Sequence, residues 1–162
     1  MRIATKSSKL NISKLENTKK IADIFAKNIF KGNIILFYGE IGVGKTTFIK
    51  FLVNSLEKID KKNISEITSP TFSLMNQYKL NKFDIHHYDL YRLKSEKDIL
   101  SLNIFEDISD KIVLIEWPEI LGEHKPKNTI DINFEYRENF NSRYLTISAY
   151  KKLKIFDEFK SL

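Results

Sequence analysis

The chain has 162 residues, of which 42% are hydrophobic and 30% are charged. This composition is typical of a globular protein, and the length predicts a single domain over residues 1–162. Because the sequence contains no cysteine, disulfides and thiolate metal sites are excluded. Residues 1–10 lack the apolar stretch of a secretory signal, and no apolar run approaches membrane-spanning length. We therefore expect a cytoplasmic protein without a membrane partner.

The net charge of +6 comes from 27 basic and 21 acidic residues, and most of the basic residues are lysines. The lysines recur along the chain, with small clusters at 61–62 and at 151, 152 and 154. They do not alternate with arginines and aromatic residues in the way that is typical of proteins that read bases. We interpret them as a solvated surface, with a weak attraction to RNA or to an acidic partner surface as the alternative.

The first predicted helix covers residues 13–30. Ser13 suits the N-cap position, and Glu16 follows three residues later, which is the spacing of a capping box. Gly32, just past the predicted end, suits the C-terminal cap. The pattern in residues 1–12 is too weak to place a strand.

The stretch IILFYGEIGVGKTT, residues 34–47, joins a strand to a glycine-rich loop and then to a helix. Residues 34–38 form a continuous apolar run, as expected for a parallel strand that is covered on both faces. The helix is predicted to fade near Leu56, and residues 57–63 are expected to form an exposed loop. In this helix, apolar residues recur at helical spacing, at Phe48, Ile49, Leu52, Val53 and Leu56.

The loop itself fits the phosphate-binding pattern G-x-x-x-x-G-K-[ST]. Its glycines permit backbone conformations that direct successive N–H groups at phosphate oxygens, and the helix N-terminus favours an anion. Lys45 is expected to bridge the β- and γ-phosphates of a nucleoside triphosphate, and Thr46 to ligate Mg²⁺. The alternative, a glycine-rich turn with an unrelated Lys-Thr pair, is disfavoured by the flanking strand and helix. The predicted nucleotide-binding residues here are Gly39, Gly42, Val43, Gly44, Lys45, Thr46 and Thr47.

Two antiparallel strands are predicted downstream, over residues 73–80 and 83–89, because so few residues join them. The preceding TSPTF segment contains a proline that would present the hydroxyls of Ser69 and Thr71 from a rigid turn. The rest of the chain alternates between helix and strand patterns, which indicates the α/β class. A helix is predicted over 95–107, with Ser95 as N-cap and Asp98 as its partner. A buried strand over 112–115 is expected beside the phosphate-loop strand. A hairpin of 129–136 and 142–150 and a short helix over 151–160 follow.

Two acidic residues follow predicted strands. Glu116 comes directly after a fully apolar run, where a carboxylate is costly unless a cation or hydrogen bonds compensate it. We expect it to hold Mg²⁺ through the metal's water shell, and the alternative is a glutamate that reaches solvent. Asp89 is expected to orient or deprotonate the attacking water, or to share the metal. His87, on the same strand face as Asp89, is better explained as a hydrogen-bonded structural residue than as a zinc ligand.

Four motifs together resemble the TsaE (YjeE) family of small bacterial ATPases: GEIGVGKTTF at 39–48, SPTFSL at 69–74, HHYDLYRL at 86–93 and LIEWPE at 114–119. The resemblance covers most of the chain. It implies a P-loop NTPase fold with a mixed parallel and antiparallel central sheet flanked by helices. It also implies a role in forming threonylcarbamoyladenosine beside the tRNA anticodon, in which ATP binding and hydrolysis support the complex of TsaB with TsaD. Contact with tRNA would then be indirect, through that complex.

The resemblance carries over to individual residues where the motifs match. It implies that Lys45 and Thr46 contact phosphate and magnesium, that Glu116 is the magnesium-linked acid and that Asp89 is needed for hydrolysis. It further implies a switch-like segment near the γ-phosphate at Ser69–Phe72, which includes Thr71. Trp117 is implied to lie near the nucleotide, and ordinary core packing is the alternative for it. Arg143 is a weaker implied contact, because the hairpin that contains it aligns loosely.

Two other functions share this phosphate loop. A small-molecule or nucleotide kinase usually surrounds the phosphates with several arginines, whereas this chain has only Arg2, Arg92, Arg137 and Arg143. An ATP-gated interaction or RNA-binding module without enzymatic activity is the third possibility. No glutamine or arginine finger is evident from the sequence, so we expect hydrolysis to be slow for the protein alone and faster with partners.

Overall fold

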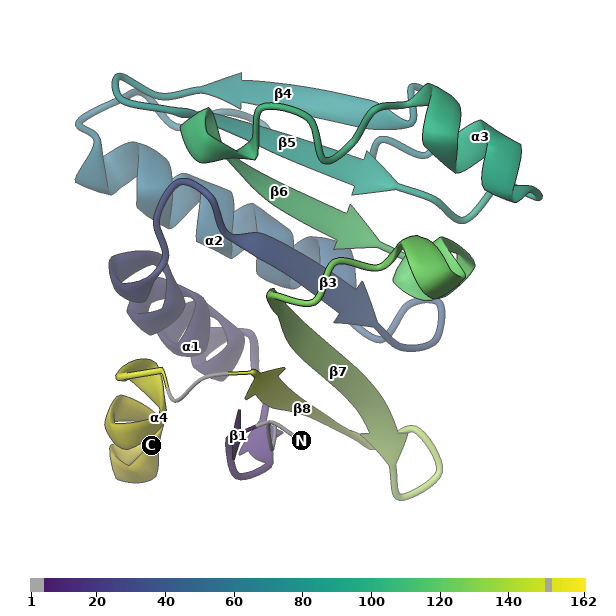
Figure 1. Cartoon of the computed structure of the whole chain (residues 1–162). Coiled ribbons are helices and arrows are strands. Elements are labelled where there is room, and N and C mark those ends of the chain that lie inside the picture. Colours follow the sequence, from purple (N-terminus) through teal and green to yellow (C-terminus); the bar gives the residue numbers. More distant parts are fainter. Residues whose placement is uncertain (1–4, 151–152) are drawn as a thin grey trace.

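The apolar runs of the sequence form the middle of an eight-stranded mixed sheet in the computed structural model, which describes residues 5–150 and 153–162 (Figure 1). The strands are β1 (Thr5–Lys6), β2 (Leu10–Asn11), β3 (Ile34–Tyr38), β4 (Met75–Lys79), β5 (Asp84–Asp89), β6 (Lys111–Glu116), β7 (Thr129–Arg137) and β8 (Ser142–Ala149). The helices are α1 (Leu15–Asn28), α2 (Lys45–Ile59), α3 (Glu96–Ser101) and α4 (Ile155–Glu158), with 3-10 helices η1 (Ile108–Asp110), η2 (Pro118–His124) and η3 (Phe159–Ser161).

The strand order is β1-β8-β7-β3-β6-β5-β4, with β2 also beside β8. The four strands β7, β3, β6 and β5 run parallel, and their pairing confirms that the strand over 112–115 lies beside the phosphate-loop strand. The β4–β5 and β7–β8 pairs are antiparallel, as predicted from the short connections. A mixed sheet of this kind brings the carboxyl ends of its parallel strands to one edge, where ligands of α/β proteins usually bind.

Helices cover both faces of the sheet (Figure 1). Residues of β3 alternate between the two cores: Ile35 and Phe37 pack with α1 and α2, whereas Leu36 faces the side that carries α3 and η2. The Phe37 ring lies 6.1 Å from that of Phe48 on α2. Burial on both sides explains why this strand reads as a continuous apolar run rather than as an alternating one.

The first helix begins later than predicted, and Ser13 is not its N-cap. Lys14 occupies that position without a side-chain cap. The Ser13 hydroxyl instead accepts a hydrogen bond from the backbone N–H of Arg143 at 3.0 Å, which ties the segment to β8. The prediction of Gly32 as the cap is also wrong, because Gly32 lies in the turn before β3, where its N–H donates to the Lys111 carbonyl at 2.8 Å.

The helix α2 is longer than its apolar period indicates, and it continues to Ile59. Glu57, predicted to lie in an exposed loop, is 3% exposed, and its carboxylate accepts the backbone N–H of Ser65 at 2.9 Å. A buried carboxylate is tolerated there because the following loop supplies a donor. The prediction that residues 57–63 form an exposed loop is therefore wrong over its first three residues, 57–59.

The capping box of α3 is confirmed, since Ser95 and Asp98 bond to each other's backbone N–H groups. The helix ends at Ser101 and does not continue to residue 107. In the C-terminal segment predicted as helical, residues 151–152 lie outside the described residues, while α4 and η3 follow from residue 155. Within the described residues, no helix is both long enough and apolar enough to cross a membrane.

Two glycines at positive φ provide a matched test of the packing around the loop. A Cβ on Gly39 would lie 2.7 Å from the Phe134 carbonyl oxygen, whereas one on Gly32 would meet nothing within 4 Å. We expect Gly32→Ala to lower the free energy of unfolding by about 1–2 kcal/mol through backbone strain alone. Gly39→Ala should cost about 1–3 kcal/mol more because β7 must shift. Urea unfolding measures both values, and equal losses would contradict the close packing of Gly39 on β7.

Candidate nucleotide-binding site

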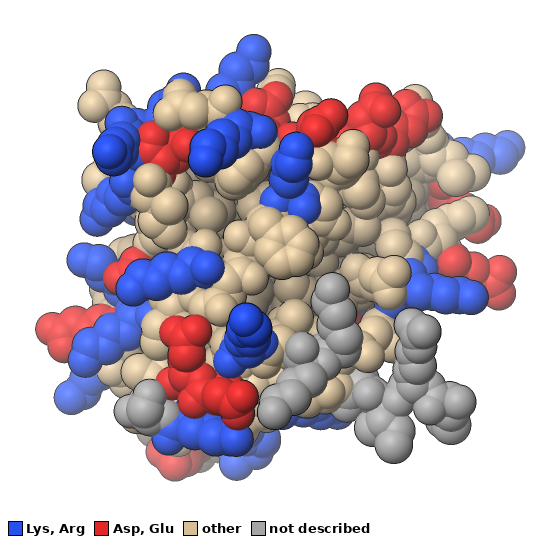
Figure 2. Space-filling model, turned by 60° about the vertical axis from the view of Figure 1, so that its left-hand side comes forward, with Lys and Arg blue, Asp and Glu red and all other residues tan. Residues whose placement is uncertain are grey.

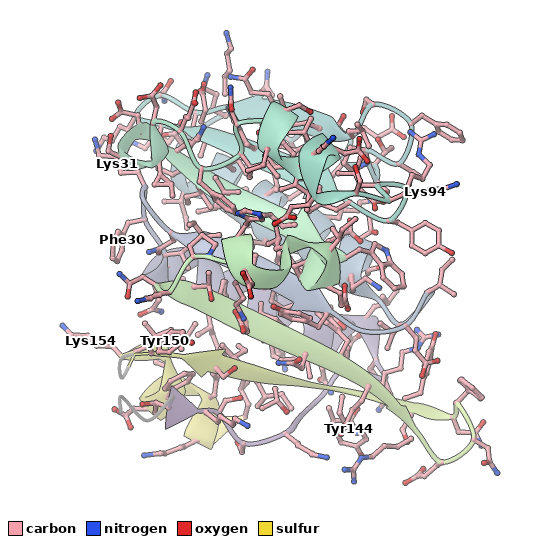
Figure 3. All side chains as sticks on the ribbon, turned by 45° about the vertical axis from the view of Figure 1, so that its right-hand side comes forward. Phe30, Lys31, Lys94, Tyr144, Tyr150 and Lys154 are labelled. Atoms are coloured by element: carbon pink, nitrogen blue, oxygen red, sulfur yellow. The ribbon has the colours of Figure 1, made fainter. Side chains whose placement is uncertain are left out.

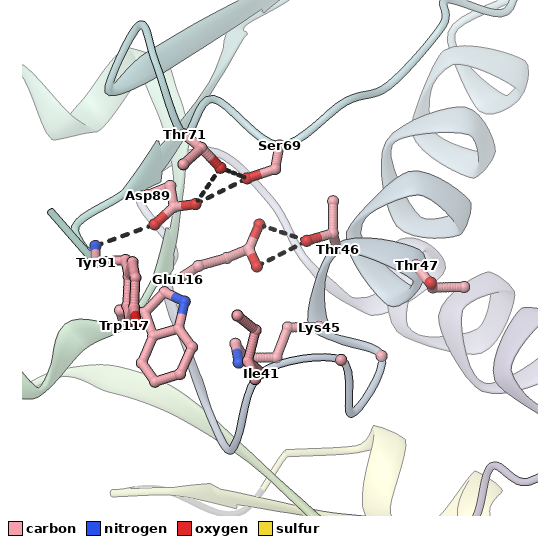
Figure 4. Close-up of a pocket in the computed structure, with 12 residues that line it drawn as sticks. Ile41, Lys45, Thr46, Thr47, Ser69, Thr71, Asp89, Tyr91, Glu116 and Trp117 are labelled. Carbon is pink, nitrogen blue, oxygen red and sulfur yellow. Dashed lines mark hydrogen bonds between the residues drawn. The ribbon is translucent and has the colours of Figure 1, made fainter.

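A pocket of about 350 Å³ opens at the carboxyl ends of the parallel strands (Figure 4). The strand register explains which residues meet there. Glu116 of β6 lies opposite Phe37 of β3 and opposite Asp89 of β5. Because β3 leads directly into the glycine-rich loop, both acidic residues lie beside the loop although they are distant from it in the sequence.

The loop and the start of α2 form one wall of the pocket, through Gly42, Gly44, Lys45, Thr46 and Thr47. Gly42 and Gly44 have φ angles of 74° and 118°, conformations that residues with a Cβ rarely adopt. Gly44 is the N-cap of α2 and offers no side-chain cap. The first N–H groups of a helix lack intrahelical partners, so this helix end is suited to an anion.

Lys45 is the cation of this wall and is only 4% exposed. Its Nζ donates to the carbonyls of Gly39 at 2.6 Å and Glu40 at 2.9 Å, and it lies 3.9 Å from the centroid of the Trp117 ring. Burial lowers the pKa of Lys45, and the charge of Glu116 opposes that effect. The ammonium is therefore held over the loop by weak acceptors that a phosphate would outcompete.

Thr46 and Glu116 are joined directly. The Thr46 hydroxyl lies 2.9 and 3.1 Å from the two carboxylate oxygens of Glu116, which is 2% exposed. A hydroxyl and a carboxylate are hard oxygen ligands, the donors that Mg²⁺ prefers. The residues present therefore fit a magnesium ion at the head of α2, adjacent to the loop that would hold phosphates. His87 Nε2 lies 2.8 Å from Glu116 Oε1 on the buried side.

Asp89 holds the turn that precedes β4. One carboxylate oxygen lies 2.8 Å from the Ser69 hydroxyl and 3.0 Å from the Thr71 hydroxyl, and the other accepts the backbone N–H of Tyr91 at 3.0 Å (Figure 4). Asp89 is 5% exposed. The carboxylate thus links β5 to a polar turn at the pocket mouth. Next to that turn, Phe72 is 90% exposed.

Trp117 adopts a left-handed conformation, with φ 57° and ψ 52°, directly before Pro118. This conformation is unfavourable for a bulky residue and for one that precedes proline. The Trp117 ring contacts Lys45, and its centroid lies 4.8 Å from that of Tyr91. The strained backbone thus turns a large aromatic ring into the pocket.

Other predicted residues lie outside the pocket lining. Val43, within the loop, is fully buried, and Gly39 contributes its carbonyl to Lys45. Arg143 lies on β8 with its guanidinium 5.6 Å from the Tyr136 ring. Conversely, Ile41 and Tyr91 line the pocket although the sequence did not single them out. Both fall within the motifs at 39–48 and 86–93, and their exposure of 73% and 57% places them at the rim.

A second hollow lies at the other end of the sheet, where Phe30, Lys31, Tyr150 and Lys154 gather (Figure 3). None of the predicted site residues is among the described residues that line it. The predicted chemistry is therefore concentrated in the pocket at the phosphate loop.

The strand, glycine-rich loop and helix, with Lys45 and Thr46 at the helix start and Glu116 on the neighbouring parallel strand, define the class of P-loop nucleotide-binding proteins with a mixed α/β sheet. The profile of one family, described as threonylcarbamoyl adenosine biosynthesis protein TsaE, matches residues 12–145. The chain belongs to the TsaE family, as its motifs predicted.

Relatives in sequence agree with this assignment, and a solved structure has the same fold. A tRNA threonylcarbamoyladenosine biosynthesis protein TsaE from Rickettsia conorii is 38% identical over 132 residues, which is 82% of this chain and 73% of the relative. The protein of the same name from Rickettsia prowazekii is 37% identical and covers 88% of this chain and 94% of its own. A crystal structure of a Bacillus YdiB protein superposes with a TM-score of 0.72 at 23% identity, over 99% of this chain and 97% of that one, which shows the same fold.

Trp117 is the single tryptophan of the chain and reports on Lys45. We expect ATP with Mg²⁺ to change its fluorescence emission, because bound phosphates would draw the ammonium away from the ring. Lys45→Met should abolish the change. Lys125→Met, which removes an ammonium 5.3 Å from the Tyr38 ring outside this pocket, should retain it. A wild-type emission spectrum that does not respond to ATP would contradict the site.

Proposed function

We propose that this protein is a Mg²⁺-dependent ATPase that supports the TsaB–TsaD complex in forming threonylcarbamoyladenosine on the adenosine beside the tRNA anticodon. The observation that carries the proposal is the Thr46–Glu116 pair, at 2.9 and 3.1 Å, at the head of a phosphate-binding loop. A hydroxyl on the helix and an acid on the adjacent strand are the parts that P-loop NTPases use to hold magnesium. Membership of the TsaE family supports the choice of pathway.

Each site residue has a proposed role. Lys45 and the N–H groups at the start of α2 bind the β- and γ-phosphates, and Thr46 with Glu116 hold the ion, which supplies neutralisation of the phosphate charge when it is bound. Asp89 acts in hydrolysis by holding the Ser69–Thr71 turn, and it orients the attacking water from that position or shares the metal. The remaining proposed nucleotide contacts are Gly39, Gly42, Val43, Gly44, Thr47, Thr71, Trp117 and Arg143; from its position beside Tyr136, Arg143 would act indirectly.

Hydrolysis by the protein alone is slow in this proposal. No arginine is among the described residues that line the pocket, so the charge that develops on the transferred phosphoryl group is met mainly by Lys45. Arg92 lies near the mouth, but its guanidinium is 5.1 Å from the Phe72 ring. Partner proteins would then accelerate turnover by completing or ordering the pocket.

The contact with tRNA is proposed to be indirect, through TsaB and TsaD. Basic side chains are numerous on the face shown in Figure 2, but acidic ones are interspersed among them. Such a mixed surface favours solvation over a continuous phosphate-tracking groove. We place the whole proposed activity in one cytoplasmic ATPase domain over residues 1–162.

The test is a steady-state ATPase assay of the protein alone and with purified TsaB and TsaD. We expect a slow basal rate that rises with the partners. Glu116→Gln should lower the stimulated rate by about 100-fold or more while ATP still binds, because the acid would help to hold the ion that neutralises the phosphate charge. The control is Glu119→Gln, an exposed glutamate three residues further along, which should remain active.

Other outcomes of this test identify the competing functions. Equal and fast turnover with and without partners would contradict the proposed dependence. Transfer of the phosphoryl group to a nucleoside or small metabolite would identify a kinase. Full function of the Glu116→Gln variant in reconstituted threonylcarbamoyladenosine formation would indicate an ATP-gated module in which hydrolysis has no part.

A further inference from the structure

One polar side chain beneath the pocket has no role in the proposed function. His87 lies in the middle of β5 opposite Leu114 of β6, and it is 0% exposed. Its Nε2 is 2.8 Å from Glu116 Oε1, and this is the only hydrogen bond of the imidazole ring among the described residues, because Nδ1 has no partner. Glu116 is therefore the group through which a role of this imidazole must act.

Burying an imidazole at such a position lowers the stability of the fold. Asn76 of β4 and Leu114 of β6 lie opposite His87, and a buried polar ring with one unpaired nitrogen is less favourable than an aliphatic side chain of similar size. A carboxylate oxygen accepts hydrogen bonds, so in this contact Nε2 carries a proton and donates it to Glu116. The histidine is thus set up as a donor to Glu116.

The Glu116 carboxylate has only one other hydrogen-bond donor among the described residues, the Thr46 hydroxyl. The Thr46 hydroxyl has a single proton. If its oxygen used a lone pair to ligate a cation, its hydrogen bond to Glu116 would change. The carboxylate would then depend on His87 for its orientation. Backbone rigidity favours the same conclusion, since His87 and Glu116 stand on adjacent parallel strands whose register is fixed by main-chain bonds.

We propose that His87 is a positioning residue that holds the Glu116 carboxylate toward Thr46 and the magnesium position. The inference rests on the proposed ATPase function and deepens it. Residues that hydrogen-bond to metal-linked side chains commonly fix their orientation in this way. His87 itself touches neither nucleotide nor ion in this proposal.

The neighbouring residue His86 provides an internal control. It points to the opposite face of β5, its ring centroid lies 6.3 Å from that of Tyr88, and its Nδ1 also lacks a hydrogen-bond partner. It has no contact with Glu116 among the described hydrogen bonds. A substitution there reports the general cost of removing a strand histidine from β5.

The experiment compares His87→Gln with His87→Asn in the full chain. The amide nitrogen of glutamine can occupy the place of Nε2, whereas that of asparagine reaches only the place of Nδ1, so only glutamine keeps a donor at Glu116. Trp117 fluorescence gives ATP affinity in EDTA and the Mg²⁺ concentration for half-saturation at fixed ATP. We expect His87→Asn to raise that concentration about 10–100-fold. His87→Gln should stay near wild type, and ATP affinity in EDTA should not change in either variant.

Several results would overturn the inference. They are equal Mg²⁺ dependence of the two His87 variants, equal weakening of ATP binding with and without Mg²⁺, or the same effect from His86→Asn. If ATP binding by the wild-type protein did not depend on Mg²⁺, the proposed function itself would be contradicted. The titration of the wild-type protein alone reveals that case.

A second measurement needs no substitution at His87. Nuclear magnetic resonance of isotope-labelled protein reports the imidazole tautomer directly. We expect the Nε2–H form for His87, with resonances that shift in Glu116→Gln while those of His86 do not. An Nδ1–H tautomer, or His87 resonances that ignore the Glu116 substitution, would also overturn the inference, even if His87→Asn does not fold.

Discussion

The hydrogen bonds from the Thr46 hydroxyl to the Glu116 carboxylate join residues that are 70 positions apart, and the pocket depends on them. They are possible because β3 and β6 are adjacent and parallel, with Phe37 opposite Glu116. The glycine-rich loop leaves β3 at the same edge at which β6 ends, so α2 starts beside the acid. A sheet in which these two strands were separated would leave the loop without its acidic partner.

Three charged groups are almost fully buried around this contact: Lys45, Asp89 and Glu116 are 4%, 5% and 2% exposed. Each is compensated by specific partners, which are carbonyls and an aromatic ring for Lys45, two hydroxyls and an N–H for Asp89, and Thr46 with His87 for Glu116. Removing such groups from water is costly, and an apolar pocket wall would be more stable. Their presence favours a site that is built for a charged ligand over one that serves folding.

The differences between prediction and structure have a common origin. The strand over residues 34–38, the Ser95 capping box and both antiparallel pairs depend on neighbouring residues or short connections, and all are confirmed. Ser13 has the right type for an N-cap, but its hydroxyl bonds to β8 instead. Glu57 has the sequence context of a solvated loop residue, but in the fold its carboxylate accepts the backbone N–H of Ser65. In both cases a partner distant in the sequence outweighs the local preference.

By itself, the sequence determined the α/β class, the phosphate-binding loop and the family, because glycine positions, apolar periodicity and motif order are written in consecutive residues. Only the tertiary structure decided which side chains meet. It paired Glu116 with Thr46 and His87, turned Trp117 onto Lys45, brought Tyr91 to the rim and left Arg143 beside Tyr136. The reason is that these contacts depend on strand order and register, which set the face and the neighbour of every side chain and leave no mark on local sequence pattern.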